Sequence, residues 1–192
     1  MTAQTHVVVG YDFSQNARAA LQRAVTHARA PRHVLHVLCV IDSRDPVPGI
    51  PAPGGVDHQY AARVQDVLVA EIQSELATSD DPTPVHFFVH ARIGKPAPEI
   101  LELAREIGAD LIVLGNHGLT GLERLVIGST SEKVVRDAGC SVEVVRVKQY
   151  RNVDLMDIVE VEPDREHPYI PPHRYVYEDH RVNLRPPEWP LY

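Results

Sequence analysis

The stretch ADLIVLGNHGLTGLERLVIGST, residues 109–130, decides the fold class because it joins a short apolar run to a glycine-rich loop. The run from Asp110 to Leu114 has the length and apolar character of a buried strand. The loop holds four glycines and leads into a helix from about Thr130 to Ala138, stopped by Gly139. A strand, a loop and then a helix form the repeating unit of a parallel α/β sheet.

The same alternation of strands and helices continues towards both ends of the chain. Further strands are predicted at His6–Tyr11, Val34–Ile41, Val85–Arg92 and Val142–Val147. Further helices are predicted after the capping side chains of Asp12–Ser14 up to about Ala28, from about His58 to Thr78, and from Pro96 up to a cap at Gly108. Five such units predict a doubly wound parallel sheet covered on both faces, with ligands beyond the carboxyl ends of the strands.

Composition excludes several classes of protein. Hydrophobic residues make up 44% of the 192 residues, which is enough for a folded core. The net charge is −7 and the arginines are scattered, so a nucleic-acid binder is not expected. No apolar run is long enough for a transmembrane helix, and no signal peptide is recognisable. Cys39 and Cys140 fit buried thiols in a reducing compartment, so we expect a cytoplasmic protein.

Three segments that follow strand ends could together bind an anion. Asp12 follows the first strand, residues 115–118 follow the fourth, and residues 128–131 open the last helix. Glycines let backbone N–H groups approach a phosphate, the helix N-terminus adds unpaired N–H groups, and three successive hydroxyl side chains add donors. Asp12 would instead hold a ribose hydroxyl or a divalent metal ion. The glycines alone fit plain turns as well, and no P-loop or GxGxxG motif is present.

The spacing of these glycines resembles the nucleotide-binding signature of the universal stress protein family. Gly115-x2-Gly118-x9-Gly128-Ser129 matches that signature with both spacings intact, and the resemblance covers residues 6 to about 148. It implies a flavodoxin-like, Rossmann-like open sheet of five parallel strands in the order 3-2-1-4-5, and commonly a dimer. The branch of the family that carries the motif binds ATP.

The resemblance also assigns roles to individual residues. It makes Asp12 a contact for ribose, phosphate or metal, and Val40 a backbone partner for adenine. The phosphate cradle that it implies consists of Gly115, Gly118, Gly128, Ser129 and Thr130. Two residues depart from the family pattern: Asn116 stands where Ser or Thr is frequent, and Ser141 where proline is frequent.

These features favour an ATP-binding regulatory or stress-tolerance module, with Mg²⁺ as companion of a triphosphate. Three alternatives stay open: a cyclic-AMP-binding protein, a slow ATPase, and a scaffold that acts through its C-terminal tail. No catalytic constellation emerges, so enzymatic activity is not predicted. His117 lies in the loop without an assigned role, and His86 and His90 share one face of a strand but lack further metal ligands.

The chain divides into a nucleotide-binding domain, residues 1–149, and a C-terminal extension, residues 150–192. The extension holds seven of the 16 prolines, no glycine and the only tryptophan. Its aromatic residues suggest packing against its own or a partner's domain, or docking to another protein. The fifth strand lies at an edge in the expected order, which predicts a homodimer through that strand.

Overall fold

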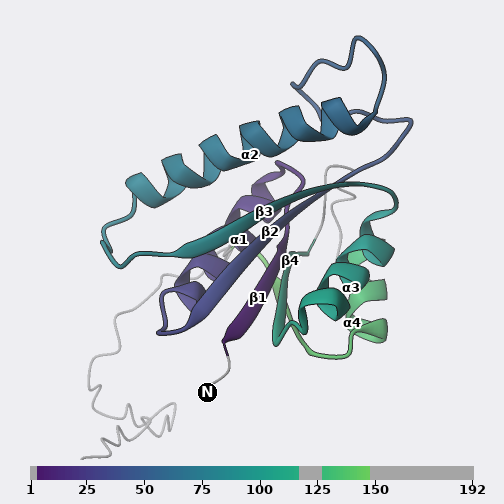
Figure 1. Ribbon diagram of the computed structural model, residues 1–192. Helices are drawn as coiled ribbons and strands as arrows, with labels where there is room; N and C mark the ends of the chain where they lie inside the picture. Colours follow the sequence, from purple (N-terminus) through teal and green to yellow (C-terminus); the bar gives the residue numbers. More distant parts are fainter. Residues whose placement is uncertain (1–3, 117–126, 148–192) are drawn as a thin grey trace, which may run out of the picture. The chain divides into compact units, whose positions relative to one another are not determined.

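The computed structural model describes residues 4–116 and 127–147 of the chain. Five parallel strands form one sheet in the order β3-β2-β1-β4-β5, which confirms the predicted fold (Figure 1). The strands are β1 Thr5–Gly10, β2 His33–Ile41, β3 His86–Ile93, β4 Leu111–Gly115 and β5 Ser141–Val145. The helices are α1 Gln15–Ala28, α2 His58–Ala77, α3 Pro96–Ile107 and α4 Ser129–Asp137.

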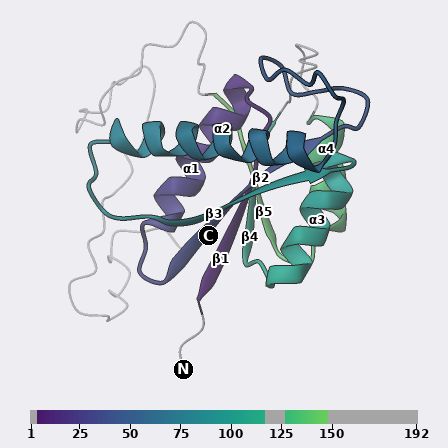
Figure 2. The ribbon, with the colours of Figure 1, turned by 45° about the horizontal axis from the view of Figure 1, so that its top comes forward.

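Helices cover both faces of the sheet and form a separate core on each. Because side chains alternate along a strand, Val7 and Val9 join the core beneath α1 and α2, whereas Val8 joins the core beneath α3 and α4. All three valines are at most 1% exposed. Figures 1 and 2 show α3 and α4 side by side, on the other side of the sheet from α2. Burial on both faces explains why the central strands β1 and β4 each contain a continuous apolar run.

Local chemistry sets the helix ends. Ser14 caps α1 by accepting a hydrogen bond from the backbone of Ala17, as its position predicts. Gly108 ends α3 in the left-handed conformation, at φ 62°, which confirms its predicted role. The expectation that Gly139 stops the last helix was wrong: α4 ends at Asp137, where Ala138 turns to an extended conformation that leads into β5.

The two edges of the sheet differ. On β3, the side-chain amide of Gln65 in α2 donates a hydrogen bond to the backbone carbonyl of Val89, at 2.7 Å. This bond uses one lone pair of the carbonyl and places a side chain of α2 over the edge, which hinders the pairing of an added strand. On β5, the carboxylate of Glu143 bonds to Arg23 and His27 of α1, on the face of the sheet that α1 covers.

Across the described part of the chain, no helix has both the length and the hydropathy of a membrane span.

Candidate functional site

The carboxyl ends of β1 and β4 define the centre of the candidate site. These strands are neighbours, but β1 leads into α1 on one face of the sheet, whereas α4, the helix after β4, lies on the other. The strand order therefore reverses between β1 and β4, and this is where open α/β sheets bind ligands. The predicted residues Asp12 and Gly115 both lie at this point, just after β1 and at the last position of β4.

Asp12 sits in a tight turn between β1 and α1. Its Oδ1 accepts a hydrogen bond from the backbone N–H of Ser14, at 3.0 Å. Between them, Phe13 has a φ of 65°, a conformation that is unusual for a bulky residue and costs energy. The ring of Phe13 packs edge-on against Tyr11, with centroids 5.1 Å apart. The turn thus fixes the Asp12 carboxylate beside the end of β1.

A polar network missed by the sequence analysis holds the base of this turn. The hydroxyl of Tyr11 donates to the carboxylate of Glu71 in α2, at 2.5 Å, and Arg18 of α1 forms an ion pair with the same carboxylate, at 3.1 Å. Burial, and then the bond to Glu71, raises the pKa of Tyr11. The tyrosine therefore stays a hydrogen-bond donor and ties the end of β1 to α2.

Val40 lies where β2 extends past its neighbour. The pairing of β1 with β2 ends at Gly10 and Leu38, and Tyr11 makes the last bond by donating to the Leu38 carbonyl. Backbone groups of successive residues in a strand point to opposite sides, so those of Val40, two residues after Leu38, point towards β1 as those of Leu38 do. Opposite Val40, however, β1 has ended and the chain has left the sheet. The N–H and C=O of Val40 consequently face the space beyond the end of β1, as a backbone partner for a ligand base requires.

Gly115 has a structural role of its own at the end of β4. A Cβ at this position would lie 2.8 Å from the carbonyl carbon and 2.9 Å from the carbonyl oxygen of Asn16 in α1. Backbone atoms cannot move aside as a flexible side chain can, so only glycine lets α1 pack this closely on β4. Only the structure reveals this reason, because Asn16 lies almost a hundred residues away in the chain.

The two ends of the glycine-rich loop are tied together. The N–H of Gly128 donates to the carbonyl oxygen of Asn116, at 2.7 Å, and the N–H of Asn116 donates to the carbonyl of Val145 in β5. The side-chain Oδ1 of Asn116 is buried and has no hydrogen-bond donor among the described residues. It is therefore available to a donor group such as a hydroxyl. Gly118 and His117 lie outside the described residues.

The N-terminus of α4 has the features of an anion site. Gly128 is its N-cap, at φ −57° and ψ 150°, and no side chain caps the helix. In residues 4–116 and 127–147, no acceptor is found for the N–H groups of the first turn, Ser129 to Ser131. The conformation of Gly128 is open to any residue, so the backbone alone does not require glycine here. Its lack of a side chain instead leaves these donors accessible.

The three hydroxyl side chains of this turn are not equivalent. Ser129 is exposed and Thr130 is half-buried, so both can reach a ligand. Ser131 is 5% exposed, and its Oγ donates to the Gly115 carbonyl, at 2.8 Å. Its expected part as a phosphate donor was wrong, because the hydroxyl proton already joins α4 to β4.

The described residues do not form a metal site by themselves. Among the described residues, no group of three or more His, Cys, Asp and Glu side chains is placed to hold a metal ion. A metal at Asp12 would therefore take its other ligands from outside this set of residues, for example from phosphate oxygens.

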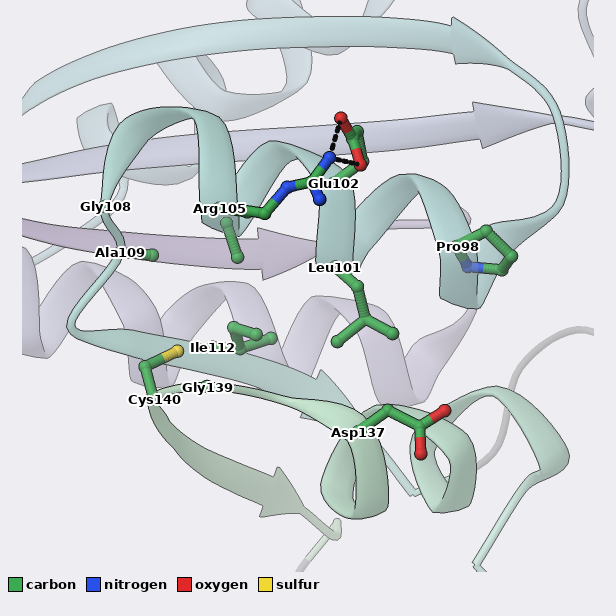
Figure 3. Close-up of a pocket in the computed structure, with 11 residues that line it drawn as sticks. Pro98, Leu101, Glu102, Arg105, Gly108, Ala109, Ile112, Asp137, Gly139 and Cys140 are labelled. Atoms are coloured by element: carbon green, nitrogen blue, oxygen red, sulfur yellow. Dashed lines mark hydrogen bonds and ion pairs between the residues drawn. The ribbon is translucent and has the colours of Figure 1, made fainter.

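A cavity of about 530 Å³ lies elsewhere, between α3 and α4 (Figure 3). Apolar side chains such as Leu101 and Ile112 line it, and the Arg105–Glu102 ion pair and Asp137 are its charged groups. It contains none of the predicted site residues, so we do not assign the phosphate cradle to it.

Comparison with known proteins points to one family. The sequence profile of the Universal stress protein family matches residues 4–146. A universal stress protein of Methanocaldococcus jannaschii is 32% identical over 143 residues, which cover 73% of this chain and 81% of that protein.

Solved structures agree. The structure of universal stress protein UspA from Lactobacillus plantarum is 29% identical, with a TM-score of 0.57, and the match covers 76% of this chain and all of that one. Two structures share the fold at lower identity. A universal stress protein in complex with cAMP is 24% identical, with a TM-score of 0.52, over 75% of this chain and 98% of that one. The universal stress protein from Archaeoglobus fulgidus in complex with dAMP is 20% identical, with a TM-score of 0.51, over 76% of this chain and all of that one.

Proposed function

Because the chain belongs to the universal stress protein family, we propose that it binds an adenine nucleotide, with ATP as the expected ligand, and acts as a nucleotide-responsive regulatory module. The observation that carries this proposal is the N-terminus of α4. Its first-turn N–H groups lack partners among the described residues. Its N-cap is Gly128, whose backbone conformation does not require glycine, so the missing side chain serves to leave these N–H groups accessible. Phosphate supplies both the charge and the acceptors that such a terminus favours.

Each part of the nucleotide has a matching group. The N–H groups at the start of α4, with the hydroxyls of Ser129 and Thr130, would hold the phosphates. The backbone of Val40 would pair with the adenine edge. Asp12 would hold a ribose hydroxyl or a phosphate-bound metal, and the Asn116 Oδ1, an acceptor only, would face a ligand hydroxyl rather than a phosphate.

Two solved complexes with this fold contain adenine nucleotides. The ligands cAMP and dAMP share an adenine base, a sugar and one phosphate. At identities below 25% these structures show the fold alone, so the argument for this chain rests on its own residues.

The direct test is to denature the purified protein and to identify any released nucleotide by chromatography and mass. Titration with ATP and with cAMP, each with Mg²⁺ and with a chelator, follows. We expect ATP to bind more tightly than cAMP, with Mg²⁺ strengthening only ATP binding. Failure to bind either nucleotide would refute the proposal and favour a scaffold. If only cAMP binds, the ligand is cAMP and not ATP. Steady release of phosphate from ATP would reveal a slow ATPase.

Asp12→Ala should weaken ATP binding at least about 10-fold, the value of one hydrogen bond to a charged group. If Asp12 acts through a metal, the loss should be larger in Mg²⁺ than in chelator, whereas a bond to ribose predicts equal losses. Asp12→Asn keeps an acceptor for the Ser14 N–H and so controls for damage to the turn. Unchanged ATP affinity in Asp12→Ala under both conditions would contradict any role for this residue.

We also propose a two-fold homodimer through the outer edge of β5. Near this edge α4 exposes Val135, which is 49% accessible, and the segment before α4 exposes Ile127 at 37%. Exposed apolar side chains beside an unpaired edge strand are typical of an interface.

Val144→Lys should shift the protein to the monomer, measured as mass by light scattering. Val145→Lys is less informative than the sequence suggested, because Val145 packs against the core beneath α1. Val67→Lys is the matched control: Val67 is 41% exposed, but it lies on α2. A Val144→Lys protein with the mass of the wild type would argue against this interface.

A further inference from the structure

Three histidines form a row across one half of the sheet, one on each of β1, β2 and β3. The Nδ1 of His6 lies 3.0 Å from the Nε2 of His36, and the Nδ1 of His36 lies 3.1 Å from the Nε2 of His90. Ring centroids are 5.2 and 5.3 Å apart along the row. The central ring is 5% exposed, and Phe88, itself 58% exposed, stacks on it.

The row follows from the register of the strands. His36 pairs with Val8 on β1 and with Phe88 on β3, so the three histidines are offset by two residues from strand to strand. Residues two apart in a strand point to the same face of the sheet. All three rings therefore lie on the face where Val8 and Leu38 pack beneath α3 and α4.

Counting hydrogens limits how many protons the row can hold. Three neutral imidazoles carry three N–H hydrogens on six nitrogens. Each of the two N···N contacts needs one hydrogen between its nitrogens, and each of the two end nitrogens can carry one. Four hydrogens therefore satisfy the row, which is one more than its neutral form has. A fifth hydrogen would place two N–H groups face to face in one contact.

We propose that His6, His36 and His90 form one proton-binding site, which takes up a single proton without losing a hydrogen bond and breaks when a second proton binds. Because each contact joins side chains of two neighbouring strands, the second proton breaks one side-chain bond between β1 and β2 or between β2 and β3, while the backbone pairing of the strands remains. Acid thereby acts on the half of the sheet farthest from β5.

The titratable and charged groups around the row lie on β3, on α3 and in the segment before β4. Arg92 lies two residues beyond His90 on β3 and is paired with Glu106 and Glu99 of α3. Asp110, before β4, accepts a hydrogen bond from the backbone N–H of His6. The exposed His86 shares the same face of β3 as His90. Arg92 and Glu106 act on His90 in opposite directions.

The burial of His36 also opposes the binding of a second proton to the row. Burial, with smaller effects from His90 and His6, lowers the pKa of His36 to about 4. Burial, then Arg92, lowers the pKa of His90, and Glu106 opposes the shift. Below pH 6.5 the unfolded chain therefore binds more protons at His36 than the folded chain does, and stability falls as the pH drops from about 6.5 towards 4.

The test compares urea unfolding of the full chain at pH 7.5 and pH 4.5. His36 alone should lower the folding equilibrium constant by roughly 70-fold between these pH values, from an unfolded pKa of about 6.5 and a folded one of about 4. His36→Leu should remove most of this loss. His58→Gln should keep it, because His58 is exposed at the start of α2. Equal pH dependence in wild type and His36→Leu would overturn the proposal.

A second measurement needs no variant and covers the case in which His36→Leu fails to fold. The ring C–H signals of the histidines can be followed by NMR in the wild-type protein from pH 8 to pH 4. We expect the His36 signal to stay that of a neutral imidazole until the pH falls below about 5, and one proton to bind to the row before that. A midpoint for His36 near 6.5 would overturn the proposal.

Discussion

Gly128→Asp is expected to remove most of the affinity for ATP while leaving the fold at least as stable as that of the wild type. An aspartate at the N-cap would accept from the first-turn N–H groups of α4, which have no acceptor among the described residues, and would complement the helix dipole, for a gain of a few tenths of a kcal/mol. Its carboxylate would occupy the phosphate position. Juxtaposed like charges cost several kcal/mol, and about 3 kcal/mol corresponds to a loss of roughly 150-fold in affinity.

Gly128→Asn is the matched control because it has the same size and capping ability without the charge. Calorimetric titration with ATP measures the affinity, and urea unfolding measures the stability. Asparagine should weaken binding by less than aspartate does, and by more than Ser129→Ala, which removes one hydroxyl contact and leaves the backbone donors. Wild-type affinity in a folded Gly128→Asp protein would refute the assignment of the phosphates to α4.

Gly115→Ala is expected to lower the free energy of unfolding by about 1–3 kcal/mol, the usual cost of overpacking. The added methyl would meet backbone atoms of Asn16 at 2.8–2.9 Å, so α1 or the end of β4 must shift. The same shift would move Asp12 and α4 relative to one another and lower nucleotide affinity as well.

Gly54→Ala controls for the general effect of replacing glycine, because no atom lies within 4 Å of a Cβ at that position. Denaturant midpoints of the two variants, measured without nucleotide, separate packing from binding. A Gly115→Ala protein as stable as Gly54→Ala would show that the approach of α1 to β4 tolerates a side chain.

The strands and helices could be predicted because their signals are local. The apolar run Val7–Val9 is buried on both faces, Ser14 caps α1, and Gly108 ends α3, each as its neighbours in the chain imply. The errors concern the ends of elements. The fifth strand was predicted to reach Val147 but ends at Val145, and α4 was predicted to stop at Gly139 but ends at Asp137, because Ala138 is already extended.

The candidate site was predictable only in part. The resemblance of the glycine spacing to a known family pointed to Gly128 and Ser129, and the structure places both at an uncapped helix N-terminus. The fixed role of Ser131 could not be predicted, because it depends on the carbonyl of Gly115, sixteen residues earlier. The direction of the Val40 backbone depends on where β1 leaves the sheet, which no local pattern shows.

Residues brought together by strand register were the hardest to foresee. His6, His36 and His90 come from three strands, and only the offset of two residues between neighbouring strands aligns their rings. The spacing of His86 and His90 shows that they share one face of β3, but it does not show that His90 contacts His36 of β2. The predicted domain boundary at residue 149 and the role of the extension concern residues beyond 147 and stay predictions.

The bond from Gln65 to the Val89 carbonyl would limit how far chains joined through the proposed β5 interface could assemble. A two-fold pair joined through β5 leaves a β3 strand at each outer end of the joined sheet. Each of these strands has its central outward carbonyl already occupied by α2. Because α2 already covers part of that edge, addition of further copies there is disfavoured, and a sheet joined in this way would end at ten strands rather than grow into a fibril.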